Sequence, residues 1–300
     1  MADNSVTRFE WAKEQYAACN VDVEQAVNRM GNYPISLQCW QGDDVGGFES
    51  KLPGSGNDGI IATGSYPGKA RTREELQEDL VFTYSLLGGE QRLNLHAMYG
   101  DFSPGGERNT ISPKNFEQWL SWGKEHGVKF DFNATCFAHP MVKGGLTLSN
   151  PDENVRGYWI EHVKQARETA VWFGREQSSP ALHNLWIPDG FKEYPADAGY
   201  FRELLIDSLD NIYSQRYDEN HCIDSVESKL FAIGAESYTT GSHEFYYGYA
   251  CKNNLYVCLD MGHFHPTESV ADKISAMLPF IPGIALHVSR GVRWDSDHVP

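Results

Sequence analysis

The sequence lacks any apolar run of the roughly 18 residues that a membrane-spanning helix requires. Its first residues, MADNSVTRFEWAKEQ, are charged and lack the apolar region of a secretory signal peptide. The six cysteines include no Cys-x-x-Cys pair and no spacing typical of a small disulfide-bonded domain. These absences predict a protein of the reducing cytoplasm that has no membrane span.

Basic residues are also scarce. The chain carries 25 Lys and Arg against 41 Asp and Glu, a net charge of −16. Nucleic acid and anionic membrane surfaces would repel such a protein, so we expect neither as a partner. Small neutral ligands and cations remain compatible with this charge.

Short apolar segments typical of strands recur along the chain. They cover residues 34–40, 92–99, 128–135, 183–190, 223–231, 254–260 and 283–290. Helix-like stretches, with apolar residues three or four positions apart, lie at residues 76–87, 159–173, 201–212 and 270–277. Alternating strands and helices predict a parallel α/β sheet. Because no glycine-rich dinucleotide fingerprint occurs, the pattern favours a TIM-type (β/α)8 barrel over a doubly wound sheet.

We expect one barrel domain over residues 1–300 that contains about seven strands. Only GVRWDSDHVP follows Arg290, which is too short for an eighth strand and the C-terminal helices. The helix over residues 159–173 is expected to begin at Asn150-Pro151, since Asn caps helices and Pro suits their first turn. Gly174 is expected to end it.

Residues 41–70 form a long segment rich in Gly, Pro, Asp and Ser. Loops of this length are uncommon in compact domains unless they are disordered or functional. This segment follows the first predicted strand, so a barrel would place it at the carboxyl end, where active sites are built. We predict an active-site loop, with a mobile surface loop as the alternative.

Polar and aromatic side chains gather where the predicted strands end. They are Trp40, His96, Asn133, Trp186, Asp189, Glu227, Lys229, Asp260, His263 and His287. The carboxyl ends of barrel strands converge on one rim, so these groups are expected to share a site. Taken singly, each has a structural interpretation, since a buried His is more often a satisfied core group and an acid is more often solvated.

Six of the residues at or after the late strands have the chemistry of metal ligands. They are Glu227, Asp260, His263, His287, Asp295 and Asp297. Four carboxylates gathered at one rim would repel each other, and one or two divalent cations would remove that conflict. Mixed carboxylate and imidazole ligands suit manganese, zinc or cobalt better than calcium.

The stretch LDMGHFHP places Asp260, His263 and His265 around Gly262, which lets the backbone turn. Asp260 and His263 could then face the same ion, while His265 either supports them or begins the next helix. Structural alternatives remain open: Glu227 and Lys229 share a strand face and could form an ion pair, and His287 could be a core residue.

Several long motifs together resemble the L-rhamnose isomerase family. They are CWQGDDVGGFE (39–49), ATGSYPGKAR (62–71), RLNLHAMY (92–99), LWIPDG (185–190), SVESKL (225–230), AIGAESYT (232–239), LDMGHFHPTE (259–268) and LHVSRGVRWDSDHV (286–299). The resemblance runs from about Phe9 to the last residue. It implies a metal-dependent barrel, similar to xylose isomerases, that interconverts L-rhamnose and L-rhamnulose in rhamnose catabolism.

The same resemblance implies roles for individual residues, with manganese as the expected ion, two ions per site and a homotetramer. A structural ion would be bound by Glu227, Asp260 and His287, and a catalytic ion by His263, Asp295 and Asp297. Trp186 would wall the sugar site, while His96 and Lys229 would bind sugar oxygens; Lys229 is also a candidate catalytic residue. This chain departs from the family at Gln38, where some members have a histidine, and it ends before the aspartate that supplies a fourth structural ligand.

Two mechanisms and two rival functions stay open at this point. Hydrogen could move between C1 and C2 as a metal-assisted hydride shift, or through a base and a cis-enediol. A two-metal hydrolase on the same barrel, acting on phosphate esters, is one alternative. An inactive fragment that binds metal or sugar is the other.

Overall fold

The structure is a computed structural model that describes residues 4–43, 45–49, 68–102, 106–229, 237–265 and 267–288. Its strands are β1 (Ile35–Gln38), β2 (Gln91–His96), β3 (Lys129–Asn133), β4 (Ala181–Leu185), β5 (Gly190–Phe191), β6 (Cys222–Glu227), β7 (Tyr238–Thr239), β8 (Tyr256–Asp260) and β9 (Ile284–His287). Its helices are α1 (Asn4–Ala17), α2 (Val23–Met30), α3 (Arg73–Ser85), α4 (Glu117–His126), α5 (Glu153–Glu176), α6 (Ala198–Tyr213), α7 (His243–Asn253) and α8 (Val270–Met277).

Seven strands form one parallel sheet in the order β1-β2-β3-β4-β6-β8-β9. The order in the sheet is thus the order in which these strands occur along the chain. Each of the seven predicted strand segments overlaps one of these strands, although three of the strands begin one or two residues earlier than predicted. The edge strands β1 and β9 approach each other, because Gln38 Nε2 lies 3.3 Å from His287 Nε2. Sequential parallel order and curling are the features of a (β/α)8 barrel, so the predicted fold class is confirmed.

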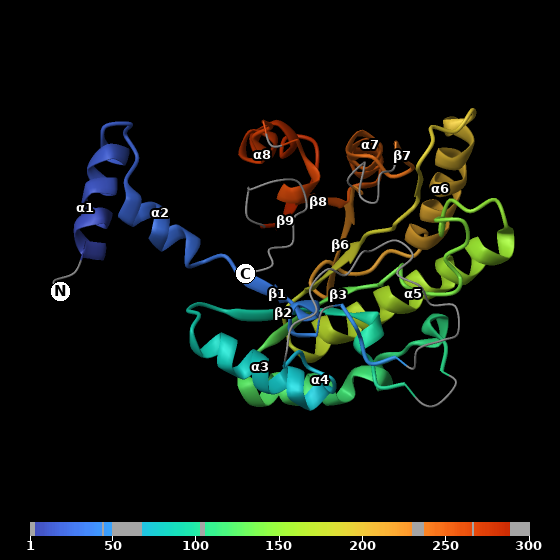
Figure 1. Cartoon of the computed structure of the whole chain (residues 1–300), viewed down its shortest axis with the longest axis horizontal. Coiled ribbons are helices and arrows are strands. Elements are labelled where there is room, and N and C mark those ends of the chain that lie inside the picture. The colour runs from blue at the N-terminus through green and yellow to red at the C-terminus, as the bar shows by residue number, and fades with distance from the viewer. Residues whose placement is uncertain are drawn as a thin grey trace.

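Helices flank the curled sheet on opposite sides. Figure 1 shows α3 and α4 on one side and α7 and α8 on the other. The longest helix, α5, turns Trp159, Val163 and Phe173 into the core, as its apolar spacing predicts. Phe173 stacks on Phe130 of β3 with ring centroids 4.8 Å apart, so α5 is fixed against the sheet by aromatic packing.

Both predicted ends of α5 are wrong by a few residues. Asp152 caps its start through the Asn154 backbone N–H, because the Asn150 side chain is occupied with Lys143 O. Gly174 lies inside the helix rather than after it. A β-carbon there would lie 1.8 Å from His221 O, so this glycine permits close approach of two backbones.

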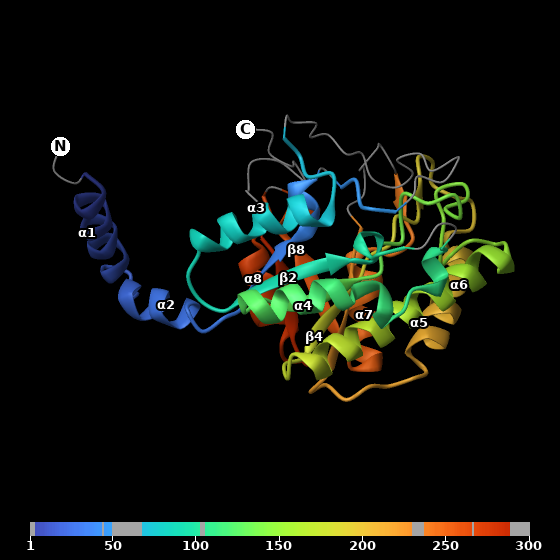
Figure 2. The ribbon, with the colours of Figure 1, turned by 90° about the horizontal axis from the view of Figure 1, so that it is seen from below.

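Helices α1 and α2 were not expected from the sequence, nor were α4 and α7. Figures 1 and 2 show α1 and α2 at one end of the molecule, away from the strands. Their apolar side chains include exposed Trp11, Tyr16 and Met30. None of the helices described by the structure combines the length and the apolar character of a membrane span.

Ion pairs connect elements in the half of the sheet that contains the amino ends of its strands. We call this half the lower half. Arg92 on β2 contacts Asp131 on β3 at 2.7 Å, and Arg167 on α5 contacts Asp224 on β6 at 2.7 Å. Burial alone would raise the pKa of Asp224, but hydrogen bonds from His183 and Arg167 hold it below its usual value. These carboxylates are therefore neutralised within the chain.

Candidate metal centre and active site

Three side chains meet at the carboxyl ends of neighbouring strands. Glu227, Asp260 and His287 are the last residues of β6, β8 and β9. His287 Nδ1 lies 3.1 Å from Glu227 Oε1 and 3.3 Å from Asp260 Oδ2. Parallel pairing explains the meeting, since β8 and β9 place Asp260 directly opposite His287.

His263 joins them through a short turn. Asp260 Oδ1 accepts a hydrogen bond from Gly262 N at 2.7 Å, which fixes the 3-10 turn Met261–His263. The turn leaves His263 Nδ1 at 3.7 Å from Glu227 Oε1 and His263 Nε2 at 3.9 Å from Asp260 Oδ2. His265 instead lies exposed, where its Nδ1 contacts Thr267 Oγ1 at 2.7 Å. It does not begin the next helix, because α8 starts at Val270 with Ser269 as its cap.

The donor atoms form two sets that share Glu227. One set contains Glu227, Cys258 and His287, and the other contains Glu227, Asp260 and His263. Within each set the ligand atoms lie within 4.8 Å of one another. We name these the inner set and the outer set. Each has the mixed donors that transition-metal or zinc sites use.

The electrostatics of the centre also fit a cation. Burial alone would lower the pKa of His287, but Cys258, Glu227 and Asp260 raise it well above its usual value. Burial would likewise raise the pKa of Asp260, but His287 and His263 hold it below its usual value. Two buried carboxylates thus rely on imidazoles for positive charge, which a divalent ion would supply more fully.

Amides that the sequence interpretation missed hold these groups in place. Asn184 Nδ2 donates to Glu227 Oε2 at 2.5 Å, and Ser225 Oγ donates to Asn184 Oδ1 at 2.7 Å. Asn94 Nδ2 donates to Gln38 Oε1 at 2.8 Å, and Gln38 in turn faces His287. Polar residues at alternate positions of otherwise apolar strands are the signal that could have revealed them.

An aromatic wall stands beside the metal centre. Trp40 packs on His96 with centroids 4.6 Å apart, and Phe137 lies 6.2 Å from His96 and 5.7 Å from Trp186. His96 Nδ1 lies 3.2 Å from Thr135 Oγ1, whereas its buried Nε2 has no hydrogen-bond partner in the described part of the chain. Burial lowers the pKa of His96 to about 3, so its imidazole is neutral near pH 7.

Asp189, just before β5, and Lys229, just after β6, differ in role. Lys229 is buried, and its Nζ donates to Pro188 O at 2.7 Å. Asp189 is fully buried and accepts hydrogen bonds from the backbone and side-chain groups of Thr147 and Ser149. Asp189 therefore fixes a loop, while Lys229 places a cation near the rim.

The described ends of the 41–70 segment are attached to this rim. Asp43 accepts from Tyr99 Oη at 2.5 Å, and Phe48 N donates to Met98 O at 2.9 Å. Glu49 forms a bidentate pair with Arg108, at 2.6 and 2.7 Å. The rest of that segment lies largely outside the described residues, as do Asp295 and Asp297.

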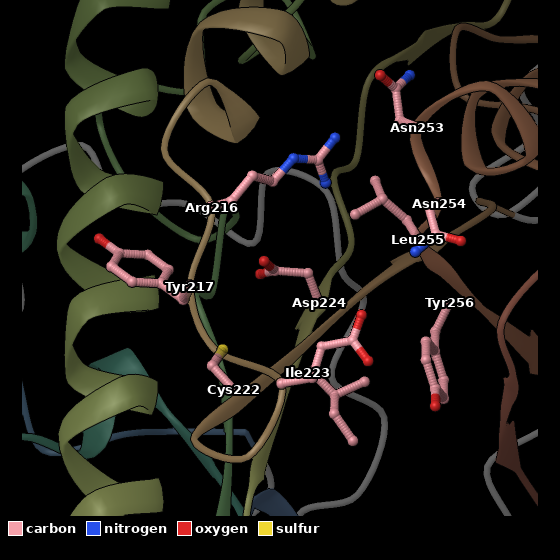
Figure 3. Close-up of a pocket in the computed structure, with 10 residues that line it drawn as sticks. Arg216, Tyr217, Cys222, Ile223, Asp224, Asn253, Asn254, Leu255 and Tyr256 are labelled. Atoms are coloured by element: carbon pink, nitrogen blue, oxygen red, sulfur yellow. The ribbon is translucent and has the colours of Figure 1, made fainter.

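A separate pocket opens at the opposite ends of the strands. It has a volume of about 360 Å³ and is lined by residues that include Arg216, Cys222, Asp224 and Tyr256 (Figure 3). Of its two acids, Asp224 is paired with Arg167, and Glu219 is exposed. The cluster of buried carboxylates and imidazoles lies at the rim and not in this pocket.

Two solved structures show a distant likeness to this chain. A D-psicose 3-epimerase crystallised in the presence of D-fructose aligns with a TM-score of 0.47 and 13% identity, covering 69% of this chain and 66% of that chain. A D-tagatose 3-epimerase-like protein aligns with a TM-score of 0.48 and 14% identity, covering 75% of each chain.

Comparison of sequences is far more specific. The family described as L-rhamnose isomerase (RhaA) matches residues 4–300. L-rhamnose isomerase of Pectobacterium carotovorum subsp. carotovorum is 50% identical over 293 residues, covering 98% of this chain and 70% of that protein. L-rhamnose isomerase of Rhodopirellula baltica is 50% identical over 298 residues, covering 99% and 70%. The chain therefore belongs to the L-rhamnose isomerase family and is an isomerase.

Proposed function

We propose that the protein is a metal-dependent aldose–ketose isomerase that interconverts L-rhamnose and L-rhamnulose in cytoplasmic rhamnose catabolism. The observation that carries this proposal is the juxtaposition at one rim of two metal-donor sets and an aromatic wall. Cations suit oxygen-rich substrates, and aromatic rings suit the apolar face of a sugar. Family membership supports the choice of sugar.

We assign the ions to the residues that the resemblance implies. Glu227, Asp260 and His287 would hold one, and His263 with Asp295 and Asp297 would hold the other. Manganese is the proposed ion, with zinc and cobalt as the next candidates. When bound, such ions polarise the reacting sugar oxygens as Lewis acids.

The protonation pattern of the described residues supports these assignments. His263 Nδ1 lies 2.8 Å from Ser228 O, an acceptor, so in the neutral form of the ring the proton would lie on Nδ1 and the lone pair on Nε2. In that form Nε2, which lies 3.9 Å from Asp260 Oδ2, would be the atom that coordinates a cation. Hydrogen bonding of the other ring nitrogen to a carbonyl is the usual support of a metal-ligating histidine.

The sugar itself would be positioned by three groups. Neutral His96 presents Nε2 to a hydroxyl, since that buried atom has no partner in the described residues. Trp186 contributes apolar wall, and Lys229 contributes positive charge near the reacting oxygens. We include residues 41–70 as a segment that borders the bound sugar, because its described ends contact the rim.

We favour a hydride shift between C2 and C1 over an enediol route. Both carboxylates of the donor sets, Glu227 and Asp260, face imidazoles, which suits ligands better than a free base. In a hydride shift the migrating hydrogen never exchanges with water. Deuterium from the solvent appearing at C1 of the product during turnover would count against this route.

The proposed function is tested on the chain after metal removal with a chelator. Adding manganese should restore formation of L-rhamnulose from L-rhamnose, and the chelated protein should form none. A generic phosphate ester under the same conditions tests the hydrolase alternative. Ester cleavage without rhamnose turnover would replace the isomerase with a hydrolase.

A further inference from the structure

Arg108 is a buried arginine that joins two loops at the rim. Its Nε and Nη2 donate to the two carboxylate oxygens of Glu49, at 2.7 and 2.6 Å. Its Nη1 donates to Thr135 O at 2.7 Å and to Phe137 O at 2.5 Å. The guanidinium therefore connects the segment after β1 to the loop after β3 through charge-assisted hydrogen bonds. Glu49 balances its charge, since an unpaired buried cation is costly.

The loop after β3 has a backbone conformation that needs such support. Thr135 and Ala138 both have positive φ angles, of 57° and 49°. This left-handed region is unfavourable for residues other than glycine, above all for a β-branched residue such as Thr135. Arg108 Nη2 also donates to Ala138 O at 3.4 Å, so the guanidinium reaches the carbonyls of both residues. Without these hydrogen bonds, we expect the loop to relax toward ordinary backbone angles.

The conformation of this loop places two groups of the candidate sugar site. Thr135 Oγ1 lies 3.2 Å from His96 Nδ1, and this contact fixes the imidazole so that Nε2 is the atom left for a sugar hydroxyl. The centroid of the Phe137 ring lies 6.2 Å from that of His96 and 5.7 Å from that of Trp186. One loop thus orients the imidazole and supplies the ring that lies between it and Trp186.

We propose that Arg108 is a positioning residue of the sugar site. By fixing the loop over residues 134–138 and the segment over residues 45–49, it orients His96 and Phe137 toward the bound sugar. The inference rests on the proposed function for the identity of the sugar. It does not rest on that function for the orientation of His96, which can be measured in the sugar-free protein.

Arg92 offers a matched control, because it is a buried arginine with the same kind of contacts at the other end of the sheet. Its guanidinium pairs with Asp131 and donates to Phe130 O and Pro180 O. Lysine keeps the charge but lacks the planar set of donors, so Arg108→Lys and Arg92→Lys should both lower the melting temperature. Effects on the sugar site should separate the two variants.

The kinetic test uses L-rhamnose and manganese with the full-length protein. Arg108→Lys should raise KM about tenfold or more and lower kcat by less than about threefold, because it weakens binding of the sugar in the ground state and in the transition state alike. Arg92→Lys should leave KM within about twofold of wild type. An unchanged KM in Arg108→Lys, or an equal rise in Arg92→Lys, overturns the proposal.

Glu49→Gln keeps the proposal testable if Arg108→Lys does not fold. This variant removes the carboxylate charge that holds the guanidinium, while Arg108 itself stays in place. It should raise KM for L-rhamnose in the same direction, by about threefold or more, with kcat little changed. A wild-type KM in Glu49→Gln would show that the pair does not position the sugar site.

A second readout needs neither sugar nor metal. Isotope-labelled histidine reports the ring nitrogens by NMR, and the signals of His96 are those missing from His96→Gln. Arg108→Lys and Glu49→Gln should shift or broaden these signals, whereas Arg92→Lys should leave them unchanged. Unshifted His96 signals in both rim variants overturn the positioning role. Shifted signals, in a protein whose wild type does not convert L-rhamnose, support the positioning role and reject the proposed function.

Discussion

Strand β6 carries one buried carboxylate near each end, and the two carboxylates have different types of basic partner. Near its start, Asp224 faces the guanidinium of Arg167 at 2.7 Å. At its end, Glu227 lies 3.1 and 3.7 Å from the imidazoles of His287 and His263, and it accepts a hydrogen bond from the neutral amide of Asn184. The two acids are three residues apart on one strand, and both are largely buried. Burial is thus common to both acids, and the nature of the partner separates them.

This difference distinguishes a structural charge from a functional one. A guanidinium is permanently positive, so the lower pair is complete whatever ligands are present. An imidazole is positive only when protonated, so the upper acids depend on a proton or another cation. The ion pairs of the lower half therefore stabilise the fold, while the rim carries negative charge that a metal ion can neutralise.

Glu227→Gln is expected to give the largest effect. Glu227 belongs to both donor sets, so its loss should lower L-rhamnose turnover by roughly 10³-fold or more. Manganese should raise the melting temperature of the wild type but not of the variant, because bound metal stabilises only the chain that binds it. Turnover and differential scanning calorimetry, each with and without manganese, measure both effects.

The matched control is Asp224→Asn on the same strand. It should lose stability equally with and without manganese, and it should keep the rise in melting temperature that manganese produces. The contrast between the two ends would be wrong if Glu227→Gln kept full turnover, or if Asp224→Asn lost its response to manganese.

Arg167→Met is expected to give the next largest effect. It would leave the buried carboxylate of Asp224 without its guanidinium, which costs about 3 kcal/mol of unfolding free energy. Urea denaturation should show this loss with and without manganese. Arg175→Met, at the exposed end of the same helix, should change the unfolding free energy by less than about 0.5 kcal/mol. Equal losses in the two variants would mean that burial of the pair contributes nothing.

The third prediction concerns how the free energy of unfolding depends on pH. His96 has a pKa lowered to about 3 by burial, against about 6.5 in an unfolded chain. Between these two pH values the unfolded chain binds a proton at His96 and the folded chain does not. The free energy of unfolding is therefore unaffected by His96 above about pH 6.5 and decreases as the pH is lowered below it. The expected slope is about 1.4 kcal/mol per pH unit between roughly pH 6 and pH 4.

Urea denaturation of the metal-free protein across that range measures the slope. His96→Gln removes the titrating group and should make the profile flatter than that of the wild type by the stated amount. The buried His183, beside Asp224 at the other end, should keep its own contribution in both proteins. Parallel profiles for wild type and His96→Gln would show that His96 is not buried as a neutral group.

The sequence allowed the strands and the rim to be predicted because both follow from short-range pattern. Apolar periodicity located all seven strands of the main sheet, and polar residues at strand ends indicated which side chains would share a site. Helix α1 and helix α2 were missed, since exposed apolar residues such as Trp11 and Met30 obscure their amphipathic pattern.

Contacts that depend on curling of the sheet could not be predicted from pattern. Gln38 and His287 lie 249 positions apart, and they meet only because the two edge strands approach. The same holds for Cys258, whose place beside Glu227 depends on the register of two strands. Periodicity identifies which face a side chain occupies, but it contains no information on which distant residue faces it.

The contact between Gln38 and His287 gives the last and smallest expected effect. Replacing Gln38 with Met removes a hydrogen-bonding group 3.3 Å from His287 Nε2, so the imidazole is oriented by its carboxylate neighbours alone. We expect manganese affinity, measured by calorimetry, to fall about threefold to tenfold, which corresponds to one ordinary hydrogen bond. Gln38→His keeps a polar ring at this position and should lie closer to wild type. Unchanged manganese affinity in Gln38→Met would show that charge alone determines metal binding at the rim. The lower half would then differ from the rim, because each of its guanidinium–carboxylate pairs combines charge with hydrogen-bond geometry.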